Sequence, residues 1–178
     1  YLDAVSDMAA RSRSALDQYR GALAAGALGG YREANTFLRG AALLSPTDPS
    51  IQTTWGDLFL EKYNYADALK SFEEALNLDD EWAPAHLGLA RVLADENPSL
   101  ARASAERALE IDPSMAAVHL FIAGQELDDR NRDAARGAID RALEINPRNL
   151  EARALLGAIA YLEDRTADFD AEVARALE

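Results

Sequence analysis

The sequence Ala-Leu-Glu-Ile-Asp-Pro at residues 108–113 decides the fold, because variants of it recur along the chain at a fixed interval. Related copies stand at 41–46, 75–80 and 142–147, and Ala176-Leu177-Glu178 begins another. The leading alanines of the four full copies lie 33 or 34 residues apart. A fixed period of this length is typical of a solenoid, in which each repeat buries its apolar face against its neighbours. The period therefore favours recognition, rather than chemistry, as the first expectation for function.

Small residues form two further columns with the same period, one in each half of the repeat. Such columns let two antiparallel helices approach closely while larger side chains fill the gaps between them. We therefore expect an all-α solenoid built from antiparallel helix pairs. The columns are Ala22, Gly56, Ala90, Ala123 and Gly157 in the first half, and Ala34, Ala68, Ala101 and Ala135 in the second.

Turn residues divide the chain into repeats of helix, turn, helix and turn. Asn64, Asn97 and Asn131 stand before the second half of their repeats, where an Asn side chain can cap the free N–H groups of a helix. The third repeat is one residue short near Asn97. The predicted repeats are 15–48, 49–82, 83–115, 116–149 and 150–178, which form one domain over 15–178, and residues 1–14 are expected to form a helix leading into it.

Composition and charge narrow the classes of partner. The chain of 178 residues carries 18 basic and 31 acidic side chains, for a net charge of −13. Such a surface repels phosphate backbones and anionic lipid, so we expect no nucleic-acid partner. The sequence contains no apolar run long enough for a membrane span, so we expect no membrane insertion. A simpler interpretation of the charge is that it keeps exposed helix faces soluble.

The second repeat resembles the tetratricopeptide repeat. Trp55-Gly56, Phe59, Ala68 and Phe72 match the aromatic and small-residue frame of that family, and the chain is similar to about five tandem copies. The resemblance implies a right-handed superhelix whose first helices line a concave groove that binds a peptide. The sequence begins at Tyr1 rather than Met and stops inside a helical pattern, so we also expect a piece of a longer protein.

Three positions depart from the pattern of this family. Gly21 stands where Leu or Trp is usual, Asp80 replaces the expected proline, and Phe169 replaces a small residue. We therefore expect the first and last repeats to be distorted or to serve as interfaces.

The helical spacing and the resemblance together predict which side chains line the groove. The predicted groove is polar towards its N-terminal side and apolar towards its C-terminal side, so the expected partner is a protein or peptide with an apolar face. The alternative is an architectural or self-association domain that packs against other parts of a larger protein and has no free peptide ligand. The predicted groove residues are Asp57, Leu60, Leu87, Arg91, Leu120, Phe121, Gly124, Leu127, Ala154 and Tyr161.

No motif for catalysis or for a cofactor is present in the sequence. His86 and His119 share one column of adjacent repeats, and Glu126 follows two helical turns after His119, so a metal or acid–base site has to be considered. The distance between packed helices, about 10 Å, makes convergence on one metal difficult. We expect Glu126 to pair with a neighbouring cation instead, and we expect no metal, no cofactor and no enzymatic activity.

Overall fold

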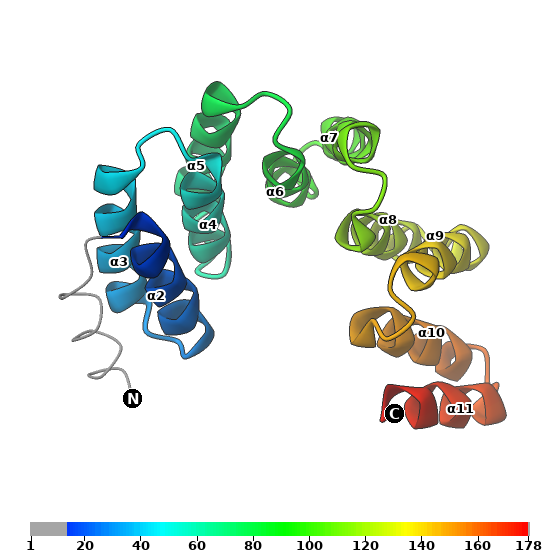
Figure 1. Ribbon diagram of the computed structural model, residues 1–178. Coiled ribbons are helices and arrows are strands. Elements are labelled where there is room, and N and C mark those ends of the chain that lie inside the picture. Colours follow the sequence, from blue (N-terminus) through cyan, green and yellow to red (C-terminus); the bar gives the residue numbers. More distant parts are fainter. Residues whose placement is uncertain (1–13, 178) are drawn as a thin grey trace. The chain divides into compact units, whose positions relative to one another are not determined.

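The computed structural model describes residues 14–177, and every regular element in that range is an α-helix (Figure 1). The predicted all-α fold is confirmed. The helix expected over residues 1–14 falls almost wholly outside the described residues, because only Ser14 is included. The helices are α2 (Ala15–Ala27), α3 (Tyr31–Leu44), α4 (Pro49–Leu60), α5 (Tyr65–Leu78), α6 (Ala83–Leu93), α7 (Pro98–Ile111), α8 (Ala116–Asp128), α9 (Arg132–Ile145), α10 (Leu150–Leu162) and α11 (Thr166–Ala176).

The chain divides into two compact units, residues 1–95 and 96–178. In the first unit α2 packs on α3 and α4 packs on α5, and α6 packs against α5. In the second unit α8 packs on α9 and α10 packs on α11. The division falls in the turn between α6 and α7, within the repeat that the sequence places at 83–115. The five-repeat division itself stays a prediction.

Side-chain caps fix where the second helices begin. The predicted Asn caps are confirmed: the Asn64 side chain accepts from the Asp67 N–H, and Asn97 and Asn131 act in the same way on α7 and α9. Each cap satisfies a backbone N–H that has no partner within the helix. Two first helices are capped in the same way: the Asp48 side chain caps α4 and the Asn149 side chain caps α10.

A residue with left-handed backbone geometry precedes the second helix in four of the turns. The φ angles are 75° at Gly29, 56° at Tyr63, 61° at Arg130 and 58° at Asp164. In the described turn before Asn97, where the sequence is one residue shorter, no residue has this geometry. Only Gly adopts the left-handed region without steric cost, so three of these turns carry local strain.

We predict that Arg130→Gly stabilises the protein by about 1 kcal/mol, because it removes the contact between Cβ and the backbone at positive φ. The reciprocal control is Gly29→Ala. A Cβ at Gly29 meets nothing within 4 Å, so its effect reports backbone strain alone, and we expect a loss of about 1 kcal/mol. Urea unfolding measures both changes. A destabilising Arg130→Gly would show that the turn tolerates its residue without strain.

The ring of Phe72 packs where α4, α5 and α6 of the first unit meet. Phe72 is fully buried, and a Cβ added at Gly56 would lie 2.5 Å from its ring. A Cβ at Gly88, on α6, would lie 2.2 Å from the same ring. Phe37 plays a related part against Gly21, where the added Cβ would lie 3.0 Å away. The departure at Gly21 is therefore explained by the room that the Phe37 ring takes.

We predict that Gly88→Ala destabilises the protein by about 1–3 kcal/mol, because its methyl group would overlap the fully buried Phe72 ring. Gly124→Ala is the matched control in another first helix. Its Cβ meets nothing within 4 Å, so the better helix propensity of Ala should stabilise α8 by about 0.5–1 kcal/mol. Thermal or urea unfolding gives both values. Equal effects of the two substitutions would contradict the packing described here.

Candidate functional site

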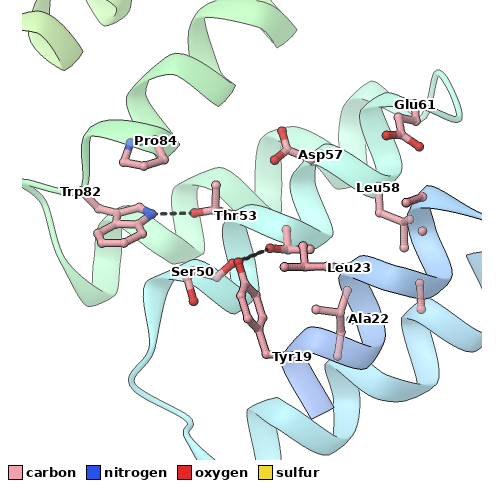
Figure 2. A pocket seen from close by; sticks show the side chains of 15 residues that line it. Tyr19, Ala22, Leu23, Ser50, Thr53, Asp57, Leu58, Glu61, Trp82 and Pro84 are labelled. Carbon is pink, nitrogen blue, oxygen red and sulfur yellow. Dashed lines mark hydrogen bonds between the residues drawn. The ribbon is translucent and has the colours of Figure 1, made fainter. Parts of the chain in front are cut away.

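The first unit carries a hollow of about 460 Å³ along its first helices (Figure 2). Tyr19 and Leu23 reach it from α2, and Thr54 and Leu58 reach it from α4. Trp82 closes one end, just before α6 begins. Leu23 is 46% exposed, so an apolar side chain stands open to the hollow.

Hydrogen bonds hold the polar side chains of the hollow in place. Trp82 Nε1 donates to Thr53 Oγ1 at 2.9 Å, and Thr53 Oγ1 donates to the Pro49 carbonyl at the same distance. Thr54 Oγ1 bonds the Ser50 carbonyl at 2.8 Å and the Tyr19 hydroxyl at 3.1 Å. Figure 2 shows the bond between Trp82 and Thr53 as a dashed line, and a second dashed line ends at the Tyr19 hydroxyl. Because each threonine is also anchored to its own helix, this part of the hollow is preformed.

Charge gathers at one edge of the hollow. Asp57 and Glu61 stand one turn apart at the end of α4, and both line it. Arg91 Nη1, from α6, lies 3.8 Å from Asp57 Oδ1. Burial raises the pKa of Asp57, Arg91 opposes that rise, and the nearby Glu61 carboxylate adds to it. The ion pair is about half exposed on both sides, so we expect it to contribute less than about 1 kcal/mol.

In the first unit, three of the four predicted groove residues lie close together. Asp57, Leu60 and Arg91 lie with Glu61 around a shallow hollow of about 470 Å³ next to the one in Figure 2. Leu87 is only 4% exposed. A side chain this buried offers little area to a partner, and the assignment of Leu87 to the groove stays a prediction.

In the second unit, the predicted residues divide among several environments. Leu120 is 4% exposed and belongs to the hydrophobic core, and Leu127 packs against the same core, so their places in the groove stay predictions. Phe121 lines a separate hollow of about 200 Å³ with Ile122 and the first turn of α7.

The remaining predicted residues of the second unit lie open. Gly124 has free space beside it, and Ala154 and Tyr161 are exposed on α10. Tyr161 is 69% exposed and contacts Phe169 in a tilted arrangement, with ring centroids 6.1 Å apart and planes at 58°. Ala154 also lines a hollow of about 310 Å³ between α10 and α11.

Sequence reasoning missed the side chains that α2 contributes. Leu23 precedes Asp57 by one full period, and Tyr19 precedes Thr53 in the same way. Extending the groove columns into the first repeat would have found both. No sequence signal marks Trp82, which reaches the hollow because of its hydrogen bond to Thr53.

The histidines and their acidic neighbour have ordinary structural surroundings. His86 Nε2 lies 2.9 Å from the Asp80 carbonyl oxygen, and burial lowers the pKa of His119. The expected pairing of Glu126 is confirmed, because it accepts from Arg102 Nη1 at 3.0 Å and from Asn131 Nδ2 at 2.9 Å. Within residues 14–177, no three His, Asp or Glu side chains group closely enough to hold a metal ion.

Length and apolar character together decide whether a helix can cross a bilayer. None of the described helices is long and apolar enough to do so.

These features define an α-solenoid with the tetratricopeptide-repeat fold. No protein-family model matches the sequence. No curated protein matches it either. The fold assignment therefore depends on the helix pairs, their small-residue columns and the likeness to solved structures.

Three solved structures illustrate that likeness. TTC0263, a tetratricopeptide protein of Thermus thermophilus, has a TM-score of 0.80 at 19% identity, over 92% of this chain and 90% of its own. PilW, a type IV pilus biogenesis factor, has a TM-score of 0.74 at 17% identity, over 93% and 77% of the two chains. YrrB, a tetratricopeptide protein with an unusual peptide-binding site, has a TM-score of 0.57 at 18% identity, over 99% and 92%. At these identities the likeness shows the fold alone.

We predict that Asp57→Asn stabilises the protein at pH 7. The folded state disfavours the ionised carboxylate, so the contribution of Asp57 is most favourable below its ordinary pKa and is lost as the pH rises through the raised pKa. The gain should vanish below about pH 3, where the carboxyl is mostly protonated in both states. The urea unfolding midpoints of the variant and the unchanged protein, measured at pH 7 and below about pH 3, test this. A loss of stability at pH 7 would mean that the ion pair with Arg91 outweighs burial.

Proposed function

We propose that this chain is a protein–protein interaction module that binds a segment of a partner along its first helices. The observation that carries the proposal is the preformed hollow of the first unit. Hydrogen bonds fix its polar walls, while Leu23, which is 46% exposed, presents apolar area to it. Fixed polar groups around an open apolar surface are typical of a ligand-binding site.

The fold supports the proposal in general terms. Stacked helix pairs form scaffolds for protein–protein interaction, with extended surfaces along the stack. YrrB, which has the same fold at low identity, carries a peptide-binding site. The location of the hollow on the first helices of this chain agrees with the groove that the resemblance implies.

A second candidate function, an architectural interface, is favoured by one observation in the second unit. A hollow of about 310 Å³ lies between α10 and α11, with Leu150, Phe169 and Val173 among its lining. Leu150 is 65% exposed and Val173 is 44% exposed. Packing of another domain or a second copy against this surface would bury them.

Binding of short peptides tests the proposal directly. We expect a random peptide library displayed on phage to yield peptides that bind the intact chain and lose binding when Gly26→Phe fills the hollow. A Cβ at Gly26 meets only Leu58 Cδ1, at 3.9 Å, so the larger side chain has room to enter the hollow. Loss of that cavity should weaken binding by about tenfold or more.

The matched control is Gly137→Phe, on the second helix α9, where an added Cβ meets nothing within 4 Å. Circular dichroism should show equal helicity in both variants. Peptides that bind both variants as well as the unchanged protein would contradict a site in the hollow. Peptides that lose binding only when Val173 is replaced by Glu would favour the architectural surface.

A further inference from the structure

We propose that the hollow of the first unit selects a cationic segment, in which an apolar side chain contacts Leu23 and Leu58 while an adjacent Lys or Arg pairs with Asp57 and Glu61. This inference is based on the proposed function, because it assigns the chemistry of the ligand to that same site. It specifies more than the apolar partner expected from the sequence, since it makes positive charge the selective feature.

The apolar half of the inference depends on two leucines. Leu23 comes from α2 and Leu58 from α4, so an inserted side chain would touch both helices at once. Leu23 is about half exposed, which leaves apolar area for a ligand to cover. Alanines of α2 complete this side without adding charge.

The charged half of the inference depends on an excess of acidic side chains at the edge of the hollow. The charged side chains that line it in the described structure are Asp57 and Glu61, both acidic and one helical turn apart. Like charges at this spacing destabilise a helix by a few tenths of a kcal/mol. Arg91 approaches Asp57 at 3.8 Å, so one cation faces two carboxylates.

Part of this charge is held in an unfavourable environment. Burial and the neighbouring Glu61 both raise the pKa of Asp57, in spite of Arg91. Such positions are common at functional sites, because a ligand can supply the compensating charge. A Lys or Arg of the partner would do so, and a bidentate Arg could contact a carboxylate through two N–H groups.

A partner with basic residues fits better than a second copy of this chain. Each copy carries a net charge of −13, so two copies repel each other. The chain's own leading segment is the other occupant to test, because it contains Met8, Arg11 and Arg13.

The test uses the phage-displayed random peptides that bind the intact chain and fail on Gly26→Phe. We expect these peptides to be enriched in Lys or Arg next to Leu, Ile or Phe, and to bind more weakly as salt rises. The double variant Asp57→Asn/Glu61→Gln should weaken them by about tenfold or more. The control Glu73→Gln/Asp140→Asn removes the same charge from exposed positions on α5 and α9, and should leave binding unchanged.

The possible failures are distinguishable. Neutral or acidic peptides that lose binding to Gly26→Phe would contradict a cationic ligand and still support a binding site in the hollow. The same conclusion would follow if the selected peptides bound the Asp57→Asn/Glu61→Gln variant as well as the unchanged protein. Absence of any Gly26-dependent peptide would overturn the proposed function itself. Binding that appears only after residues 1–13 are deleted would assign the hollow to the chain's own leading segment and also overturn the inference.

Discussion

The close approach of helices around Phe72 is the constraint on which the packing of α4, α5 and α6 depends. Gly56 belongs to the same predicted repeat as Phe72 and Gly88 belongs to the next, so one ring fills the space between α4, α5 and α6. Neither glycine has room for even a methyl group. This packing holds α4 against α6, and α4 also supplies side chains that line the hollow together with those of α2. In a core packed at this density, even one added methyl group displaces neighbouring side chains and lowers stability.

Much of this fold could be predicted from the sequence because its determinants are periodic. Asn64, Asn97 and Asn131 act as caps where the period places them, and the alanine columns are buried. The site was harder to predict. Leu87 and Leu120 share a column with Tyr19, yet they are buried while Tyr19 lines the hollow. Their exposure depends on neighbouring side chains, which differ from repeat to repeat and leave no periodic signal.

The hollow combines features that the fold does not require. Thr53 and Thr54 are tied both to their own helix and to the aromatic side chains of Trp82 and Tyr19, so the polar walls are rigid. Asp57 is kept where burial disfavours its charge. Two carboxylates one helical turn apart beside open apolar area suit a binding site, and the fold does not require them. The Glu126 cluster differs in this respect, because both oxygens of its carboxylate accept hydrogen bonds.

The most direct measurement is an NMR titration of the intact chain with a peptide selected for binding, followed through backbone amide and leucine methyl signals. We expect the largest shifts at Leu23, Thr54 and Leu58, in the hollow between α2 and α4. Shifts confined to α10 and α11, around Leu150 and Val173, would contradict a site in the hollow and assign recognition to the second unit.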